Sequence, residues 1–485
     1  MPNAVAYLAL MAWPVVCLVL FQRLRPGIAL IWSILGGYLL LPELTALDLP
    51  LVPSLDKTSV PALSALVIMV MLLGLRPSFV PRDGIVRLLV LVAIFGAVPT
   101  VLTNPDPILF QVLAGTDPIR FITDALPGLR TIDLVSAIST QVLMLLPFFL
   151  ARAFLGTEDG LRALLVAFLL AGLAYSVPAL LEVRISPQLN ILIYGFFQHS
   201  WEQMIREGGF RPIVFLPHAL WLAMFFVTAA LAAAALARGS DSAARPRLIA
   251  ALVYLVVVVW LCKSLASKLY LMAFVPMVLF APPRWQIRAA VAIAVVAIVY
   301  PMLRNLHLIP LDLILRQAEA YSAERAQSLG FRFGNEEQLL ARAAEKPWFG
   351  WGGWGRNLIR DAETGAILTI PDGRWIIMFG THGWVGYLAQ MGLLTAPLFL
   401  LGWRMRRLPD EAITPTLAAL CLILAVTLLD MLLNDTLVAM IWMVSGAVLA
   451  RVEVLSHGPV TARRSLFPGG PAIGRDAGQR PRSLL

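Results

Sequence analysis

The stretch IVFLPHALWLAMFFVTAALAAAALA, residues 213–237, contains no Asp, Glu, Lys or Arg. A helix needs about 20 apolar residues to cross the hydrocarbon core of a bilayer. This stretch is therefore long enough to span a membrane, and similar runs recur along the whole chain. Their repetition decides the fold class, because a chain with many such runs folds as a bundle of membrane-spanning helices.

The composition supports the same fold class. The chain has 485 residues, of which 59% are hydrophobic and 14% are charged. Soluble globular proteins average about 45–50% apolar and about 25% charged residues. The composition therefore excludes an ordinary soluble protein and predicts an integral membrane protein with many spans.

Thirteen apolar runs are candidate spans, and two of them are short enough to be re-entrant or tilted. The runs lie at 4–22, 27–43, 61–75, 84–103, 133–154, 161–181, 213–237, 248–264, 266–281, 287–303, 379–402, 412–430 and 436–455. We therefore expect an all-α polytopic protein with about 12–13 transmembrane helices.

Basic residues orient the connecting loops. Short loops that carry Arg23 and Arg25, Arg76 and Arg82, Arg152 and Arg162, Arg238 to Arg247, Arg284 and Arg288, or Arg404 to Arg407 alternate with longer ones. Excess Arg and Lys is typical of cytoplasmic loops. We therefore expect the longer loops, 44–60, 104–132, 182–212 and 304–378, to be extracytoplasmic. The net charge of +9 has the same explanation, so we expect no nucleic-acid partner.

The two ends and the cysteines carry little chemistry. The N-terminal run lacks a basic region and a cleavage site, so we expect a retained span rather than a signal peptide. Residues 456–485 are rich in Pro, Gly and Arg, which predicts a disordered cytoplasmic tail. The three cysteines lie in apolar runs and indicate neither disulfides nor a metal site; they are Cys17, Cys262 and Cys421.

The loop 304–378 is the largest polar segment. It separates ten spans in 1–303 from the last three in 379–455. Its first part predicts a helix lying on the membrane surface. A short helix should follow, with Asn335 as its N-cap, Glu336 and Glu337 in its first turn and Pro347 after its end.

The sequence EKPWFGWGGWGRN, residues 345–357, comes directly after that helix. We expect Pro347, Gly350 and Gly352 to form a structural turn that reverses the chain. Its tryptophans could anchor the loop at the membrane interface or stack on sugars, and both interpretations stay open.

Cationic side chains cluster where spans meet the longer loops. Arg211, Lys268 and Arg332 are the candidates for binding a diphosphate, because Arg offers a bidentate fork and Lys a point charge. Arg332 would also lie just before a helix start, where free backbone N–H groups favour anions. Snorkelling to the interface is the alternative explanation for each of them.

Acid–base candidates are few. Asp372 precedes the span 379–402, and His382 lies near the start of that span. His218 and the pair Asp430 and Asp435 are better explained by packing, solvation or pairing with arginine. We found no HExxH motif, Cys/His cluster or nucleotide-binding loop, so we expect no metal and no cofactor.

In four stretches the chain resembles the O-antigen ligase/polymerase superfamily of bacterial membrane glycosyltransferases. The stretches are GGFRPIVFLPHALWLAMF, KSLASKLYLMAF, RFGNEEQLLARAAEKPWFGWGGWG and DGRWIIMFGTHGWVGYLAQMGLL. Arg211, Pro217, Arg332, Pro347, Gly350, Gly352, Gly383 and Gly386 match the family pattern. Four positions depart from it: His218 stands where Asn is common, Lys268 where Arg is usual, Glu336 in a Trp slot and Asp372 in a slot often filled by His.

The resemblance implies a GT-C-like fold in the bacterial inner membrane, with the large loop outside. It implies transfer of a glycan from undecaprenyl diphosphate to a glycan or lipid acceptor hydroxyl, in surface polysaccharide synthesis. Arg211, Arg332 and Lys268 would stabilise the leaving diphosphate, and Asp372 or His382 would serve the acceptor. Ligase and polymerase stay undecided. The alternatives are a transporter or flippase of lipid-linked substrates and a non-catalytic envelope scaffold.

Overall fold

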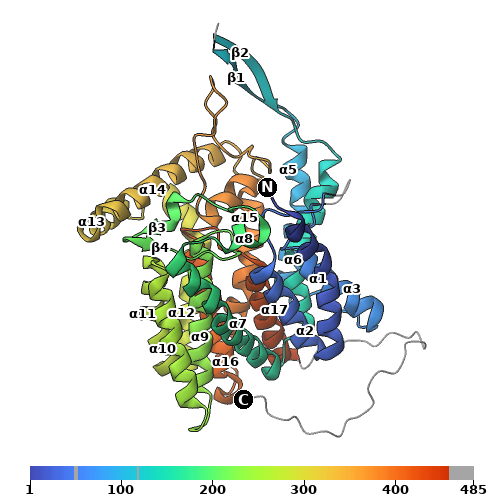
Figure 1. The fold of residues 1–485 in the computed structure, drawn as a ribbon. Helices are drawn as coiled ribbons and strands as arrows, with labels where there is room; N and C mark the ends of the chain where they lie inside the picture. Colours follow the sequence, from blue (N-terminus) through green and yellow to red (C-terminus); the bar gives the residue numbers. More distant parts are fainter. Residues whose placement is uncertain (49–52, 117–118, 458–485) are drawn as a thin grey trace.

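The computed structural model describes residues 1–48, 53–116 and 119–457, and most of them are helical (Figure 1). Within these ranges, eight helices are long and apolar enough to cross a membrane. They are α1 (Ala4–Arg23), α4 and α5 (Gly84–Phe95 and Ala97–Leu102, counted together), α6 (Asp133–Phe154), α7 (Glu158–Ile185), α9 (Ala219–Arg238), α12 (Pro283–Asn305), α15 (Arg374–Arg404) and α17 (Ala439–His457).

Shorter helices complete the bundle. Four of them are apolar: α2 (Pro26–Leu40), α3 with the π-helical turn η1 (Val60–Val67 and Ile68–Leu72), α11 (Leu265–Phe280) and α16 (Pro415–Asp430). Helix α10 (Arg245–Leu261) lies between α9 and α11 in the chain. Each of the thirteen apolar runs therefore corresponds to a helical segment, and the protein is a multi-pass α-helical membrane protein.

The short basic loops lie at one end of the bundle, and the longer loops lie at the other end (Figure 1). At the basic end, salt bridges join loops that are distant in sequence, such as Arg404 with Asp83 and Arg284 with Asp410. We call the opposite end the large-loop end, because residues 306–373 lie there. The N-terminus lies at this end, where Asn3 donates to the carbonyl of Ile193 at 3.0 Å.

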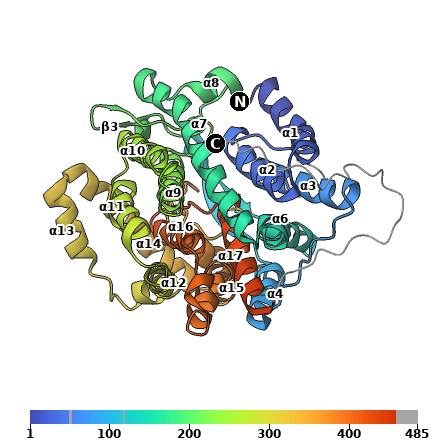
Figure 2. The same ribbon diagram turned by 90° about the horizontal axis from the view of Figure 1, so that it is seen from below.

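Helix α9 forms the centre of one half of the bundle (Figure 2). Its run of alanines allows α7, α10, α11 and α16 to pack closely around it, and nearly all of its residues are buried. Small residues are typical of tightly packed membrane helices. The apolar run 213–237 is not helical throughout, because residues 213–218 precede the helix and His218 caps it: the backbone N–H of Leu220 donates to His218 Nδ1 at 2.9 Å.

The segment between α12 and α15 differs from expectation. It contains α13 (Leu311–Tyr321), which buries no side chain, and one long helix, α14 (Ala323–Ala344). Asn335 is therefore inside a helix and is not an N-cap. Its Oδ1 accepts a hydrogen bond from the backbone N–H of Ile370 at 2.8 Å, a contact with the returning chain that the local sequence does not encode.

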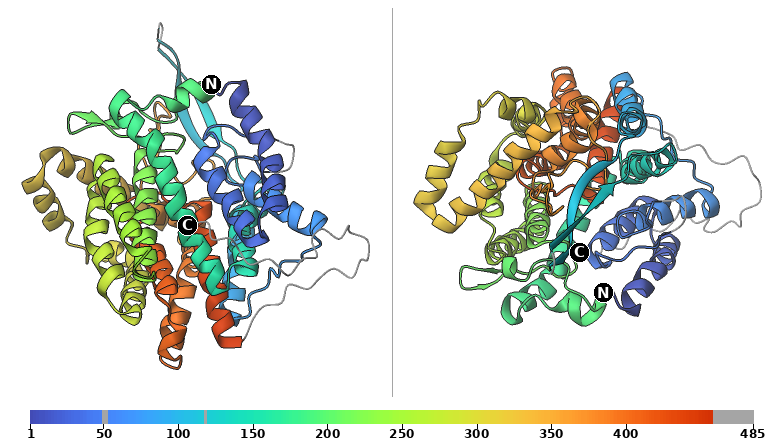
Figure 3. Two further views of the ribbon diagram at one scale, coloured as in Figure 1. Left: turned by 60° about the horizontal axis from the view of Figure 1, so that its bottom comes forward. Right: turned by 90° about the horizontal axis from the view of Figure 1, so that it is seen from above.

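Small strands were also missed. The loop 104–132 contains the hairpin of β1 (Ile108–Thr116) and β2 (Ile119–Leu126), which projects from the large-loop end (Figure 3). The segment after α7 contains α8 (Leu189–Tyr194), the turn η2 (Glu202–Met204) and the short hairpin of β3 (Ile205–Arg206) and β4 (Gly209–Phe210). One 3-10 turn, η3 (Asp410–Ala412), lies at the basic end. The expected disordered tail, 456–485, falls outside the described residues from 458 onward.

Candidate functional site

The β3–β4 hairpin positions Arg211 at the large-loop end. Glu207 and Gly208 turn the chain with positive φ angles of 51° and 67°. The backbone N–H of Arg211 then donates to the carbonyl of Met204 at 2.8 Å. Beyond it, the carboxylate of the buried Glu182 accepts from the backbone N–H groups of Ile213 and Val214, at 2.8 and 2.7 Å. These contacts hold Arg211 in place without using its side chain.

The guanidinium of Arg211 is buried and has unused donors. Its residue is 2% exposed, and neither Nε nor Nη2 has a hydrogen-bond partner among the described residues. Burial lowers the pKa of Arg211 to about 10, and the charges of Arg206, Arg332 and Arg325 act in the same direction. Buried charges in proteins are normally paired. An unpaired guanidinium in a cationic setting is a ready site for an anionic ligand.

Arg332 lies on α14 and faces the segment that follows α16. Its Nη1 donates to Asn434 Oδ1 at 2.9 Å and to the carbonyl of Leu433 at 3.1 Å. Its Nε lies 3.6 Å from Asp372 Oδ2. Since Arg332 is in a helix interior, the expectation that backbone N–H groups of a helix start would accompany it is wrong. The guanidinium alone provides its donors.

Asp372 and Arg332 are thus brought together as an ion pair. Burial raises the pKa of Asp372 above its usual range, while the charges of Arg332 and His199 oppose that rise. A carboxyl with a raised pKa is a better proton acceptor than an exposed aspartate. This environment differs from that of an exposed aspartate, whose pKa is about 4.

His199 and His218 lie near these residues, and sequence reasoning missed His199. We call Arg211, Arg332, Asp372 and the two histidines the cluster. The rings of His199 and His218 meet edge to face with centroids 4.4 Å apart. Burial lowers the pKa of His199, and the charge of Arg211 acts in the same direction, while Asp372 opposes it. His199 Nδ1 accepts the backbone N–H of Ser200, so its Nε2 carries the proton when the ring is neutral. The only indication of His199 in the sequence was its place near Trp201 in a long loop, and that indication is weak.

Lys268 belongs to a separate belt of ion pairs. Its Nζ lies 3.9 Å from Glu207 Oε2 and 4.8 Å from the ring centroid of Trp260. Glu207 also pairs with Arg325. Arg206 pairs with Glu324 at 3.2 Å. Among the cations named here, Arg211 is therefore the one that forms no salt bridge within the described part of the chain.

Glu336 stands where the family pattern has Trp, and it stabilises the helix that carries Arg332. It is buried, lies 3.4 Å from Nη2 of Arg304 and accepts from Trp375 Nε1 at 3.3 Å. Burial raises the pKa of Glu336 to about 7, against the opposing charge of Arg304. This pairing ties α14 to α12 and α15.

The Gly/Trp turn packs against a break in α15. Gly383 has φ 62° and ψ −167°, which interrupts the helix. A Cβ built on Gly383 would lie 2.4 Å from the carbonyl carbon of Trp348, and one on Gly350 would lie 2.5 Å from that of Thr381. Gly352 has φ 81°, and a Cβ on it would lie 2.8 Å from Leu129. Backbone hydrogen bonds also join the turn to the region of the break: Gly352 donates to the carbonyl of Thr381 at 2.9 Å, and Trp384 donates to that of Pro347 at 2.7 Å.

His382 directly precedes this break, and the one arginine whose charge acts on it among the described residues is Arg374. No hydrogen bond, ion pair or ring contact joins it to Arg332 or Asp372 among the described residues. Two tryptophans of the turn, Trp348 and Trp354, are exposed. Trp351 instead packs face to face with Arg342, whose Cζ is 3.4 Å from the ring centroid.

A cavity of about 450 Å³ lies between α6, α9 and α17. Its apolar wall comes from α6, α9 and α17, and includes Met144, Trp221 and Trp442. Lys57 and the ion pair of Arg374 and Asp435 add polar groups. Pro217, next to His218 in the chain, also lines it, whereas Arg211, Arg332 and Asp372 are not among its described lining residues. Ligand sites in proteins typically have this size and mixture.

No family model matches the chain, and no curated protein matches it. Among the described residues, no group of three or more His, Cys, Asp or Glu side chains lies close enough together to hold a metal ion. The assignment of function therefore depends on the geometry of the cluster.

Proposed function

We propose that the chain is a GT-C-like membrane glycosyltransferase of the O-antigen ligase/polymerase type. In this proposal it moves a glycan from undecaprenyl diphosphate to an acceptor hydroxyl, at the outer face of the bacterial inner membrane. The observation that supports this proposal most directly is that the guanidinium of Arg211 is buried and has unused donors. A lipid diphosphate would supply the missing negative charge at the membrane surface.

The reaction breaks the bond between the sugar C1 and the diphosphate oxygen and forms a bond from C1 to the acceptor oxygen. The leaving diphosphate gains negative charge as the bond breaks. Arg211 would donate to it, and donors held in place before the reaction stabilise such charge most effectively. Arg332 would add its positive charge, while its contacts with Asn434 and Leu433 keep it oriented.

The acceptor hydroxyl must lose a proton. Asp372 is the base that the geometry favours, because burial raises its pKa and Arg332 holds it in place. His199, whose charge also acts on Asp372, would help to position that carboxylate rather than act as the base. His382 has no comparable partner, so we assign it no catalytic role. The cavity lined by Pro217, Trp221 and Arg374 would hold part of the lipid or the acceptor.

A transporter would use a broken span as its binding site. The break in α15 is instead filled by protein, because the carbonyls of Pro347 and Trp348 accept the freed N–H groups of Trp384 and Val385. This favours the enzyme over the transporter.

The test is to express the Arg211→Gln and Arg332→Gln variants in the native host and analyse surface polysaccharide on gels. Arg316→Gln, on the exposed face of α13, is the control. We expect lipid-linked glycan to accumulate in the first two variants only. Accumulated single units would indicate a polymerase, and accumulated full-length polymer a ligase. Normal polysaccharide in both variants at normal protein levels would refute the proposal.

A further inference from the structure

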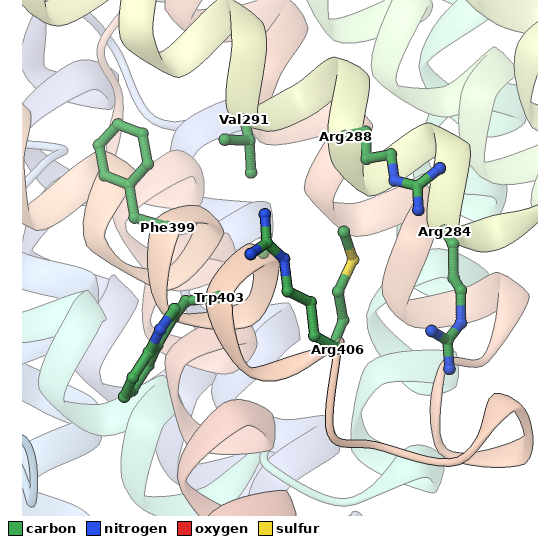
Figure 4. A pocket seen from close by; sticks show the side chains of 8 residues that line it. Arg284, Arg288, Val291, Phe399, Trp403 and Arg406 are labelled. Atoms are coloured by element: carbon green, nitrogen blue, oxygen red, sulfur yellow. The ribbon is translucent and has the colours of Figure 1, made fainter.

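A second cavity lies at the basic end, far from the cluster described above. It has a volume of about 480 Å³ and lies between the start of α12 and the end of α15. Three arginines line it: Arg284 and Arg288 from α12, and Arg406 just after α15 (Figure 4). Nothing in the proposed transfer reaction uses this site.

The charges in this cavity are only partly compensated. Arg284 pairs with Asp410 at 2.6 Å and donates to the carbonyl of Leu408 at 2.7 Å. Arg288 stacks on Trp285, with its Cζ 4.9 Å from the ring centroid. Neither Arg288 nor Arg406 forms a salt bridge with an acidic side chain in the described ranges. Two positive charges are therefore left for a ligand.

The apolar side of the cavity fits a lipid rather than a soluble anion. Val291 on α12 and Phe399 on α15 also line it (Figure 4). Trp403 is exposed beside Arg406. Exposed aromatic rings near the ends of spanning helices are typical of the membrane interface. A Cβ on Gly402 would lie 2.8 Å from Val291, so α12 and α15 pack closely together along one side of the cavity.

We propose that this cavity binds the headgroup of an anionic phospholipid. The phosphate would lie between Arg288 and Arg406, and the acyl chains would follow the apolar surface past Val291 and Phe399. Basic pockets between helix ends attract such lipids. A zwitterionic headgroup fits less well, because its own cation would face the arginines. The proposal is independent of the transfer reaction.

The test uses the full-length chain in lipid nanodiscs that contain equal amounts of phosphatidylglycerol and phosphatidylcholine. Native mass spectrometry then measures which lipid stays bound. The main variant is Arg288→Gln/Arg406→Gln. The matched control is Arg23→Gln/Arg25→Gln, which removes two exposed charges from the same end. Size-exclusion elution and the melting midpoint check folding.

We expect the main variant to lose the preference for phosphatidylglycerol by about tenfold or more, since each interfacial cation is worth roughly fivefold. The control should keep the preference. An unchanged preference in the main variant, or an equal loss in the control, would overturn the proposal. Where the double variant is unstable, Arg406→Gln alone should lose about fivefold, and no loss there would also overturn it.

Inorganic phosphate distinguishes the two sources of a phosphate group. Added at millimolar concentration, it should leave the bound phosphatidylglycerol in place, because it makes no contact with the apolar wall. Displacement of the lipid by inorganic phosphate would identify a site for free anions and overturn the lipid assignment.

Discussion

The backbone N–H of Trp384 donates to the carbonyl oxygen of Pro347 at 2.7 Å, and this bond joins the Gly/Trp turn to the broken helix α15. The next N–H, from Val385, donates to Trp348 at 3.1 Å. Both donors are free because Gly383 interrupts the helix. Unpaired backbone N–H groups inside a protein cost free energy. The turn avoids this cost because its carbonyl groups accept the two N–H groups.

We expect Gly383→Ala to lower the free energy of unfolding by about 2 kcal/mol or more. Its φ and ψ lie in a region that is essentially limited to glycine, and a Cβ there would collide with Trp348. Gly334→Ala is the control, because Gly334 is inside α14 and has open space around it. Thermal unfolding in detergent measures both. Equal stability of the two variants would show that the break does not require glycine.

A buried ion pair at the basic end gives a second prediction. Nη2 of Arg152 lies 2.9 Å from Glu453 Oε2, and both side chains are almost fully buried. Glu453→Gln should destabilise the protein by about 3–5 kcal/mol, because it leaves the buried arginine charge without an anionic partner.

The matched control is Glu158→Gln, which breaks a more exposed pair with Arg451 at 3.6 Å. Its cost should be below about 1 kcal/mol. Melting midpoints of both variants provide the comparison. An equal loss of stability on breaking the exposed pair and the buried pair would contradict this prediction.

Glu336 should make stability depend on pH. Its pKa is raised by burial from 4.5 to about 7. Between these values the folded chain holds a proton that the unfolded chain has released, so this contribution falls as pH rises. The total change is about 3 kcal/mol at most.

The measurement compares Glu336→Gln with the parent chain from pH 4.5 to 8. The difference in melting midpoint between them should shift in favour of the variant as pH rises. The histidines near Arg211 have lowered pKa values and act in the opposite direction, but they are present in both proteins and cancel. A difference that stays constant with pH would show that Glu336 titrates normally.

His218 should act as a helix cap that asparagine can replace. Its Nδ1 accepts the N–H of Leu220, and its Nε2 lies 3.2 Å from Gln203 Oε1. His218→Asn should keep stability within about 0.5 kcal/mol, whereas His218→Ala should lose about 1 kcal/mol. Unfolding curves test this, and equal losses in the two variants would rule out capping as its role.

Much of the helical bundle could be predicted from hydropathy, because crossing a bilayer imposes a length and a composition on each span. The thirteen apolar runs coincide with helices to within a few residues at most ends. The first residues of the run 213–237 are the main exception. There the carboxylate of Glu182, which is distant in sequence, accepts the backbone N–H groups of Ile213 and Val214 in a segment that precedes the helix.

The large-loop end was predicted less well, because tertiary contacts decide its structure. Asn335 has the chemistry of an N-cap, but it bonds to Ile370 instead. The hairpin 108–126 was missed although IRFITDAL is rich in β-branched and aromatic residues. Arg211, Arg332 and Asp372 were chosen from sequence, and the structure places Arg332 and Asp372 together. His199 was missed, since only folding brings it to them.

The most direct test of the central claim is the affinity of the purified full-length protein for a polyprenyl diphosphate. The Arg211→Gln variant should bind about 10- to 100-fold more weakly than the parent chain, because hydrogen bonds between charged groups are each worth about 1.5–3 kcal/mol. The Arg316→Gln control should bind like the parent chain. Unchanged affinity in Arg211→Gln, with the protein folded, would contradict the assignment of Arg211 to the diphosphate.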